Sequence, residues 1–107
     1  MGRNKRERER AAALLGVRSA AGRAEQAEAV PSAEELGAED GFAFTWDGGL
    51  ALSSVYLFDS YAEASAAEAR LARERAGRGT VNGTLLVWVT GDDGMADELV
   101  GAFAGRE

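Results

Sequence analysis

The alternation of apolar and polar positions is clearest in residues 41–58, where it predicts a β-hairpin. Phe42, Phe44 and Trp46 alternate with smaller or more polar residues, which is the period of two expected for a strand. The Asp-Gly-Gly sequence at residues 47–49 follows, and these residue types tolerate the positive φ angles of a tight reversal. A second apolar run comes directly after it, and the rest of the fold is expected to form around this hairpin.

Downstream of the hairpin the apolar period changes to three and four residues, which indicates helices. Helices are predicted over Tyr61–Ala76 and Met95–Phe103, with Ser60 and Asp93 as their N-caps. Between them, Leu85–Val89 is a continuous apolar run rich in β-forming residues and follows an Asn-Gly turn. This run is expected to be a strand buried on both sides.

Upstream of the hairpin the chain is rich in alanine, arginine and glutamate, which favour helix. A helix is predicted over Lys5–Leu15, and Glu25–Ala29 is expected to resume it. Ser32 and Glu35 have capping-box spacing, which predicts a short helix over Ala33–Leu36. The organisation expected from these patterns is a basic helical arm at 1–30, a linker with a short helix at 31–40, and an α+β domain at 41–107.

The order of elements in that domain, β-β-α-β-α, predicts the fold. A helix between the second and third strands makes those strands parallel, joined by a right-handed crossover. The first strand can then lie between them, antiparallel to both. The expected fold class is α+β, with a three-stranded, mostly antiparallel sheet of order 2-1-3 in a split β-α-β arrangement. Both helices are expected on one face of this sheet.

This arrangement leaves the second face of the sheet to be covered, although the strands carry apolar side chains on both sides. There are two alternatives for what covers this face: the N-terminal helix, through Leu14, Leu15 and Val17, or a second copy of the chain. A homodimer or a protein partner is therefore expected. The aromatic residues predicted to lie at the contact are Trp46, Tyr56 and Trp88.

Charge is divided unevenly along the chain. Residues 1–23 hold seven basic and two acidic side chains, which gives them a charge of about +5. Because the net charge of the whole chain is −6, residues 24–107 carry about −11. Clustered arginines can bind phosphates, and an acidic partner such as nucleic acid or the ribosome is the alternative hypothesis. Glu7 and Glu9 weaken the local positive field. The candidate contacts are Arg3, Arg6, Arg8 and Arg10.

The composition excludes several chemistries. The chain has no cysteine and no histidine, which removes thiolate nucleophiles, zinc–thiolate sites, the usual general base and the commonest transition-metal ligand. No catalytic, cofactor-binding or metal-ligating residue is expected, and the chain is predicted not to be an enzyme. An enzyme would have to use carboxylates or a tyrosine near strand ends, namely Asp59, Asp92, Asp93, Asp97 or Tyr61.

No apolar run approaches the roughly 20 residues that span a bilayer, so no transmembrane segment is expected. Acidic residues inside the basic N-terminal stretch argue against a signal peptide, which predicts a cytoplasmic location. The segments FDSYAEASAAEARL and TVNGTLLVWVTG give residues 55–105 a resemblance to small uncharacterised α+β domains of bacteria and archaea. That resemblance implies no site residue. The function expected overall is a small interaction or assembly module that dimerises or docks through its sheet face.

Overall fold

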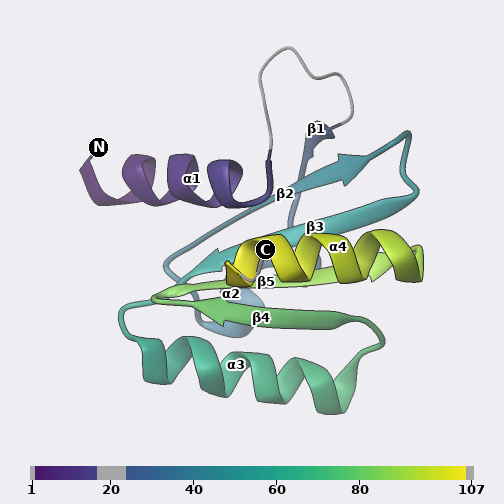
Figure 1. The fold of residues 1–107 in the computed structure, drawn as a ribbon. Helices are drawn as coiled ribbons and strands as arrows, with labels where there is room; N and C mark the ends of the chain where they lie inside the picture. Colours follow the sequence, from purple (N-terminus) through teal and green to yellow (C-terminus); the bar gives the residue numbers. More distant parts are fainter. Residues whose placement is uncertain (1, 17–23, 106–107) are drawn as a thin grey trace.

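The structure is a computed structural model that describes residues 2–16 and 24–105. A five-stranded antiparallel sheet has the order β1-β2-β3-β5-β4 (Figure 1). The strands are β1 (Ala24–Ala27), β2 (Asp40–Trp46), β3 (Ala51–Leu57), β4 (Arg78–Asn82) and β5 (Leu85–Gly91). The helices are α1 (Gly2–Leu14), α2 (Ala33–Leu36), α3 (Tyr61–Glu74) and α4 (Asp93–Ala104).

The predicted hairpin of residues 41–58 is confirmed. Strands β2 and β3 pair antiparallel, with Phe42 opposite Val55 and Trp46 opposite Ala51. The reversal uses positive φ angles at all three turn residues, which are +50° at Asp47, +74° at Gly48 and +101° at Gly49. The alternation in β2 therefore places all of its large aromatic side chains on one face of the sheet.

The predicted three-stranded sheet of order 2-1-3 is wrong, because a strand after α3 was missed. Strand β4 pairs with β5 through a two-residue turn in which Gly83 has a φ of +67°. The chain leaves α3, runs along β4 and turns back into β5. Strand β5 therefore lies antiparallel to β3, and the parallel crossover that was expected does not exist.

Strand β1 was also missed. Residues 25–29 were expected to resume a helix, whereas Ala24–Ala27 pair antiparallel with β2 at the edge of the sheet. The sequence AEQA has no β-forming residue, so its extended conformation comes from pairing with β2 and not from local propensity.

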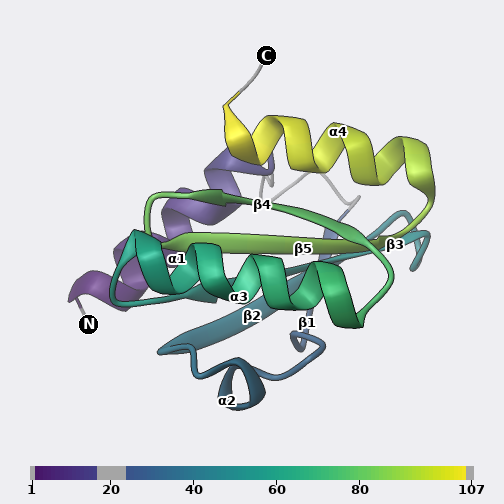
Figure 2. The ribbon, with the colours of Figure 1, turned by 90° about the horizontal axis from the view of Figure 1, so that it is seen from below.

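The sheet is covered on both faces, which overturns the prediction of helices on one face. The first face carries Phe42, Phe44 and Trp46 and is packed by α1 and α4. The second face carries Tyr56 and Trp88 and is packed by α3, with α2 and its flanking residues beside it. In Figure 2, α4 and α2 lie on opposite sides of the sheet.

Helix α1 provides the intramolecular cover that was one of the two alternatives for the first face. Ala11 and Leu15 are buried in the core under this helix, and Leu14 packs partly against it. Val17 lies outside the described residues. The opposite face is closed by the chain's own α3, so the apolar side chains of both faces are buried within one subunit.

The helix starts follow their predicted caps in two of three cases. Ser32 and Glu35 form the expected capping box of α2, and Ser60 accepts a hydrogen bond from the Glu63 amide at the start of α3. Helix α4 is capped by Asp92, whose side chain accepts from the Met95 amide, and not by Asp93 as predicted. Asp93 instead occupies the first turn of that helix.

Two glycines at the start of β4, Gly77 just before it and Gly79 within it, are required by Trp88. Gly79 lies directly opposite Trp88 in the β4–β5 pair. A Cβ atom on Gly79 would come within 2.6 Å of the indole ring and 2.4 Å of the Val87 carbonyl oxygen. The indole therefore lies flat on bare backbone, which allows the second face to bury this large ring.

Candidate functional site

The three aromatic residues predicted as contacts lie in the interior. Trp46, Tyr56 and Trp88 are 5%, 0% and 2% exposed. Each satisfies its polar atom within the chain. The Trp46 indole donates to Ser53 Oγ at 2.9 Å, the Tyr56 hydroxyl donates to the Pro31 carbonyl oxygen at 2.6 Å, and the Trp88 indole donates to the Ala76 carbonyl oxygen at 3.2 Å. These side chains hold the subunit together and are not presented to a partner.

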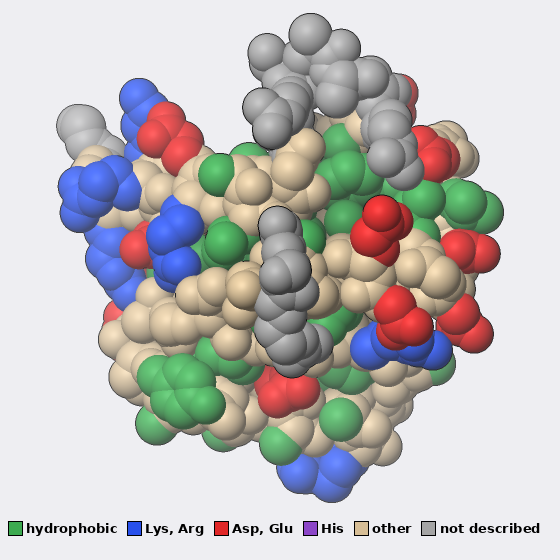
Figure 3. Space-filling view, viewed as in Figure 1, with side chains coloured by type: hydrophobic (Ala, Val, Ile, Leu, Met, Phe, Trp, Pro, Cys, Tyr) green, Lys and Arg blue, Asp and Glu red, His purple; other side chains and the backbone are tan. Residues whose placement is uncertain are grey.

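Most of the predicted basic contacts bind the chain's own acidic domain. Lys and Arg side chains gather over the N-terminal half of α1 (Figure 3). Arg3 pairs with Glu39 and donates to the Phe58 carbonyl oxygen. Arg10 pairs with Glu7 and donates to the carbonyl oxygen and side-chain oxygen of Asn82. The uneven charge of the sequence is thus largely explained by a basic helix docked on an acidic domain.

Arg8 forms the best-defined of these contacts. Its Nε and Nη2 atoms donate to the two carboxylate oxygens of Asp40, each at 2.8 Å, and its guanidinium lies 4.6 Å from the centre of the Phe42 ring. The hydrogen bonds from Arg8 hold the pKa of Asp40 below its usual range, although partial burial of the carboxylate opposes the shift. Arg6, the fourth predicted contact, is exposed and pairs with none of the described residues.

We expect Asp40→Asn to loosen α1 and to lower the free energy of unfolding by at most about 1 kcal/mol, because the Arg8 side chain is largely exposed. A depressed carboxyl pKa contributes stability above the pKa of the unfolded state and loses it as the pH falls through the folded pKa. The variant should therefore show a flatter decline of stability in acid than the wild type. Urea unfolding between about pH 2 and 7 measures this, with Glu74→Gln on α3 as the control for an ordinary helix ion pair. An unchanged acid profile in Asp40→Asn would contradict the role given to this pair.

The two edges of the sheet differ in how they are closed. Strand β4 packs against both α3 and α4 and runs between them (Figure 2). Strand β1 has no described strand on its outer side, and Glu25 and Gln26 within it are exposed. It is also shorter than its neighbour: Ala27 pairs with Ala43, so residues 40–42 of β2 extend past its end. Within the described part of the chain, the β1 side is therefore the open edge of the sheet.

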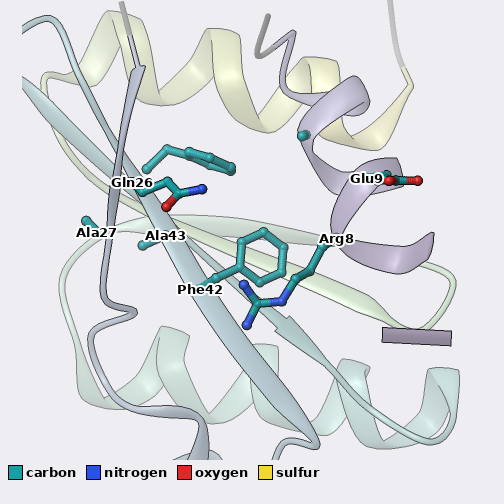
Figure 4. A pocket seen from close by; sticks show the side chains of 8 residues that line it. Arg8, Glu9, Gln26, Ala27, Phe42 and Ala43 are labelled. Carbon is teal, nitrogen blue, oxygen red and sulfur yellow. The ribbon is translucent and has the colours of Figure 1, made fainter. Parts of the chain in front are cut away.

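A groove of about 380 Å³ adjoins this edge on the first face, between α1 and β1. Figure 4 shows Gln26 projecting from β1 into this space, with Arg8 over the Phe42 ring at the α1 side. The carboxylate of Glu9 points away from it. The lining is mainly apolar and consists of Ala12, Phe42 and Phe44 with backbone and side-chain atoms of Arg8, Glu9, Gln26, Ala27 and Ala43. We call this space the α1–β1 groove.

Of the residues that line this groove, sequence reasoning identified Arg8 alone as a contact residue. Gln26 and Ala12 carry no motif, and their position at an edge depends on the pairing of β1 with β2. Within residues 2–16 and 24–105, no group of acidic side chains is arranged to hold a metal ion, and no helix is long and apolar enough to cross a membrane. Comparison with models of known protein families, with curated proteins and with solved structures found no match.

Proposed function

We propose that this chain is a non-enzymatic interaction module that binds a partner polypeptide as an added strand at the outer edge of β1. The observation that supports it is the unequal closure of the sheet. Both faces are packed by the chain's own helices, and the β4 edge runs between α3 and α4. Among residues 2–16 and 24–105, no strand pairs with the outer side of β1, and the groove beside it is unfilled. The docking surface that we propose is therefore the edge of the sheet, whereas the sequence predicted its face.

An added strand suits this edge physically. Unpaired backbone N–H and C=O groups along an edge strand form a template for another extended segment, whose main chain supplies affinity and whose side chains supply specificity. The groove offers a place for side chains of the incoming segment on the first face.

Binding to nucleic acid, the alternative expected from the basic arm, has less support. Arg3, Arg8 and Arg10 are already paired with acidic or polar groups of the same chain. Lys5 and Arg6 are the exposed cations of α1 that pair with none of the described residues. Two free cations provide a small fraction of the phosphate contacts that a specific complex uses.

The test uses a matched pair of proline variants, Glu25→Pro and Gln26→Pro, and a capped hexapeptide of alternating threonine and valine as the probe. Adjacent residues of a strand direct their N–H groups to opposite sides, so one of the two prolines removes an outward N–H and the other removes a bond of the β1–β2 ladder. We expect the peptide to shift the NMR amide resonances of residues 24–27 in the wild type. One variant should keep its thermal stability and lose this response.

Two results would contradict the proposal. The first is a wild-type spectrum in which a saturating concentration of peptide leaves residues 24–27 unchanged. The second is a peptide response of wild-type size in both folded proline variants, since binding would then not use the outward N–H groups of β1.

A further inference from the structure

The chemistry around the open edge indicates which kind of segment it takes. We infer that the partner segment alternates apolar and cationic residues, with its apolar side chains toward the α1–β1 groove and its lysines or arginines on the opposite face. This inference rests on the proposed strand addition at β1. The two faces of β1 support it separately.

The groove side is apolar. Gln26 lies opposite Phe44 in the β1–β2 pair, so both side chains point to the first face. An added strand beside β1 would place every second side chain on this same face, next to Gln26. Phe42, Phe44 and Ala12 line the adjoining space, and the Phe42 and Phe44 rings stack edge to face with centroids 5.9 Å apart. Valine-sized or larger apolar side chains fit this surface better than polar ones.

The other side is acidic. Glu25 lies opposite Thr45, so its side chain points to the second face. Its carboxylate is exposed and pairs with none of the described residues. The nearest groove cation, Arg8, is neutralised by its two hydrogen bonds to Asp40. A cationic side chain on this face would therefore meet unpaired negative charge without strong opposition from Arg8.

The experiment compares four capped hexapeptides that alternate Lys/Val, Thr/Val, Lys/Thr or Glu/Val, titrated by NMR at low salt. We expect Lys/Val to bind most tightly, about fivefold or more over Thr/Val, and Glu/Val to bind most weakly. Lys/Thr should fall below Lys/Val because it lacks apolar side chains. Raising the salt concentration should remove most of the advantage of lysine.

A matched pair of charge variants separates the local effect from the net charge of the chain. Glu25→Gln should weaken the Lys/Val peptide about two- to fivefold and leave Thr/Val unchanged. Glu68→Gln makes the same charge change on α3, which packs on the second face next to β4 and β5, and should leave both peptides unchanged. Glu25→Gln alters an exposed side chain, so the fold of this variant is expected to be intact.

The outcomes distinguish the inference from the function on which it rests. If Thr/Val shifts residues 24–27 but lysine brings no advantage, or if Glu68→Gln weakens Lys/Val as much as Glu25→Gln does, the inferred chemistry is wrong and strand addition stands. Equal binding of Lys/Thr and Lys/Val would contradict the inference that apolar side chains of the partner segment face the α1–β1 groove. If none of the peptides perturbs residues 24–27, both the inference and the partner-binding function fall. They also fall if light scattering shows a dimer and the NMR amide resonances of residues 24–27 shift as that dimer is diluted.

Discussion

Replacing Phe103 with alanine should lower the free energy of unfolding by about 3–5 kcal/mol, and Leu71→Ala should lower it by about 2–5 kcal/mol. Phe103 on α4 is fully buried in the core of the first face, and Leu71 on α3 is 1% exposed in the core of the second. Each truncation removes apolar contacts and leaves a cavity in a packed interior. Losses of this size are a large part of the stability of a small domain, and urea unfolding measures them.

The same two residues test whether α3 and α4 lie on opposite faces. The milder pair Phe103→Leu and Leu71→Val keeps the double variant folded. Because the side chains belong to separate clusters, their effects on the free energy of unfolding should add to within about 0.5 kcal/mol. A coupling clearly larger than this would place the two helices in one shared core, as in the arrangement with both helices on one face, and would contradict the two-sided architecture.

Tyr56 should make the protein lose stability in alkali. Its side chain is fully buried and donates to the Pro31 carbonyl oxygen at 2.6 Å, and burial raises the pKa of its hydroxyl to about 12. In the unfolded chain a tyrosine ionises near its ordinary value of about 10. Between these values the unfolded state releases a proton that the folded state retains. The stabilisation contributed by un-ionised Tyr56 is therefore fully present below about pH 10. The free energy of unfolding should fall by roughly 2–3 kcal/mol as the pH rises through 12.

The measurement is urea unfolding between about pH 8 and 12 on the wild type and on Tyr56→Phe. The variant should lose about 1–2 kcal/mol near neutral pH, because the Pro31 carbonyl oxygen loses its donor, and should lack this alkaline decline. Tyr61→Phe is the matched control. It removes the other tyrosine of the chain, so that a change in tyrosine absorbance with pH reports the ionisation of Tyr56 alone. Ionisation of Tyr56 near pH 10 in the folded chain would contradict the burial of its hydroxyl group and its hydrogen bond to the Pro31 carbonyl oxygen.

The elements that the sequence predicted well are those fixed by local chemistry. The hairpin of residues 41–58 follows from alternation and from turn residues that accept positive φ angles. Helices α2 and α3 follow from Ser32 and Ser60, whose hydroxyl groups satisfy the first free amides. Each of these signals lies within a few residues of the structure it specifies, so no knowledge of the tertiary fold is needed to use it.

Strand β4 could have been predicted from the sequence and was not. Asn82-Gly83 was interpreted as a turn, and a tight turn directly before the buried strand β5 requires a second strand on its other side. Thr80 and Val81 are the β-forming residues that carry that signal. Including them adds one strand, reverses the direction of β5 relative to β3, and moves α3 and α4 to opposite faces. One missed pairing thus accounts for most of the error in topology.

Strand β1 and the candidate site could not have been predicted in this way. Residues 24–27 have helix-forming side chains, and their extended conformation depends on pairing with the free side of β2, distant in sequence. The aromatic residues chosen as contacts illustrate the same limit. Hydrophobic pattern identifies Trp46, Tyr56 and Trp88 as residues that need to be buried, but whether α1, α3 or a partner buries them is decided by the tertiary fold.

Amide hydrogen–deuterium exchange of the chain, alone and with the Lys/Val hexapeptide, tests the central claim most directly. In the free protein, amides of β2, β3 and β5 should exchange slowly at every dilution, because one subunit buries both faces of the sheet. Within β1, adjacent amides should alternate between slow and fast exchange, and the peptide should slow the fast ones. If the central strands lose protection on dilution, or if the peptide protects amides elsewhere and leaves β1 unchanged, the open edge of β1 is not the docking surface.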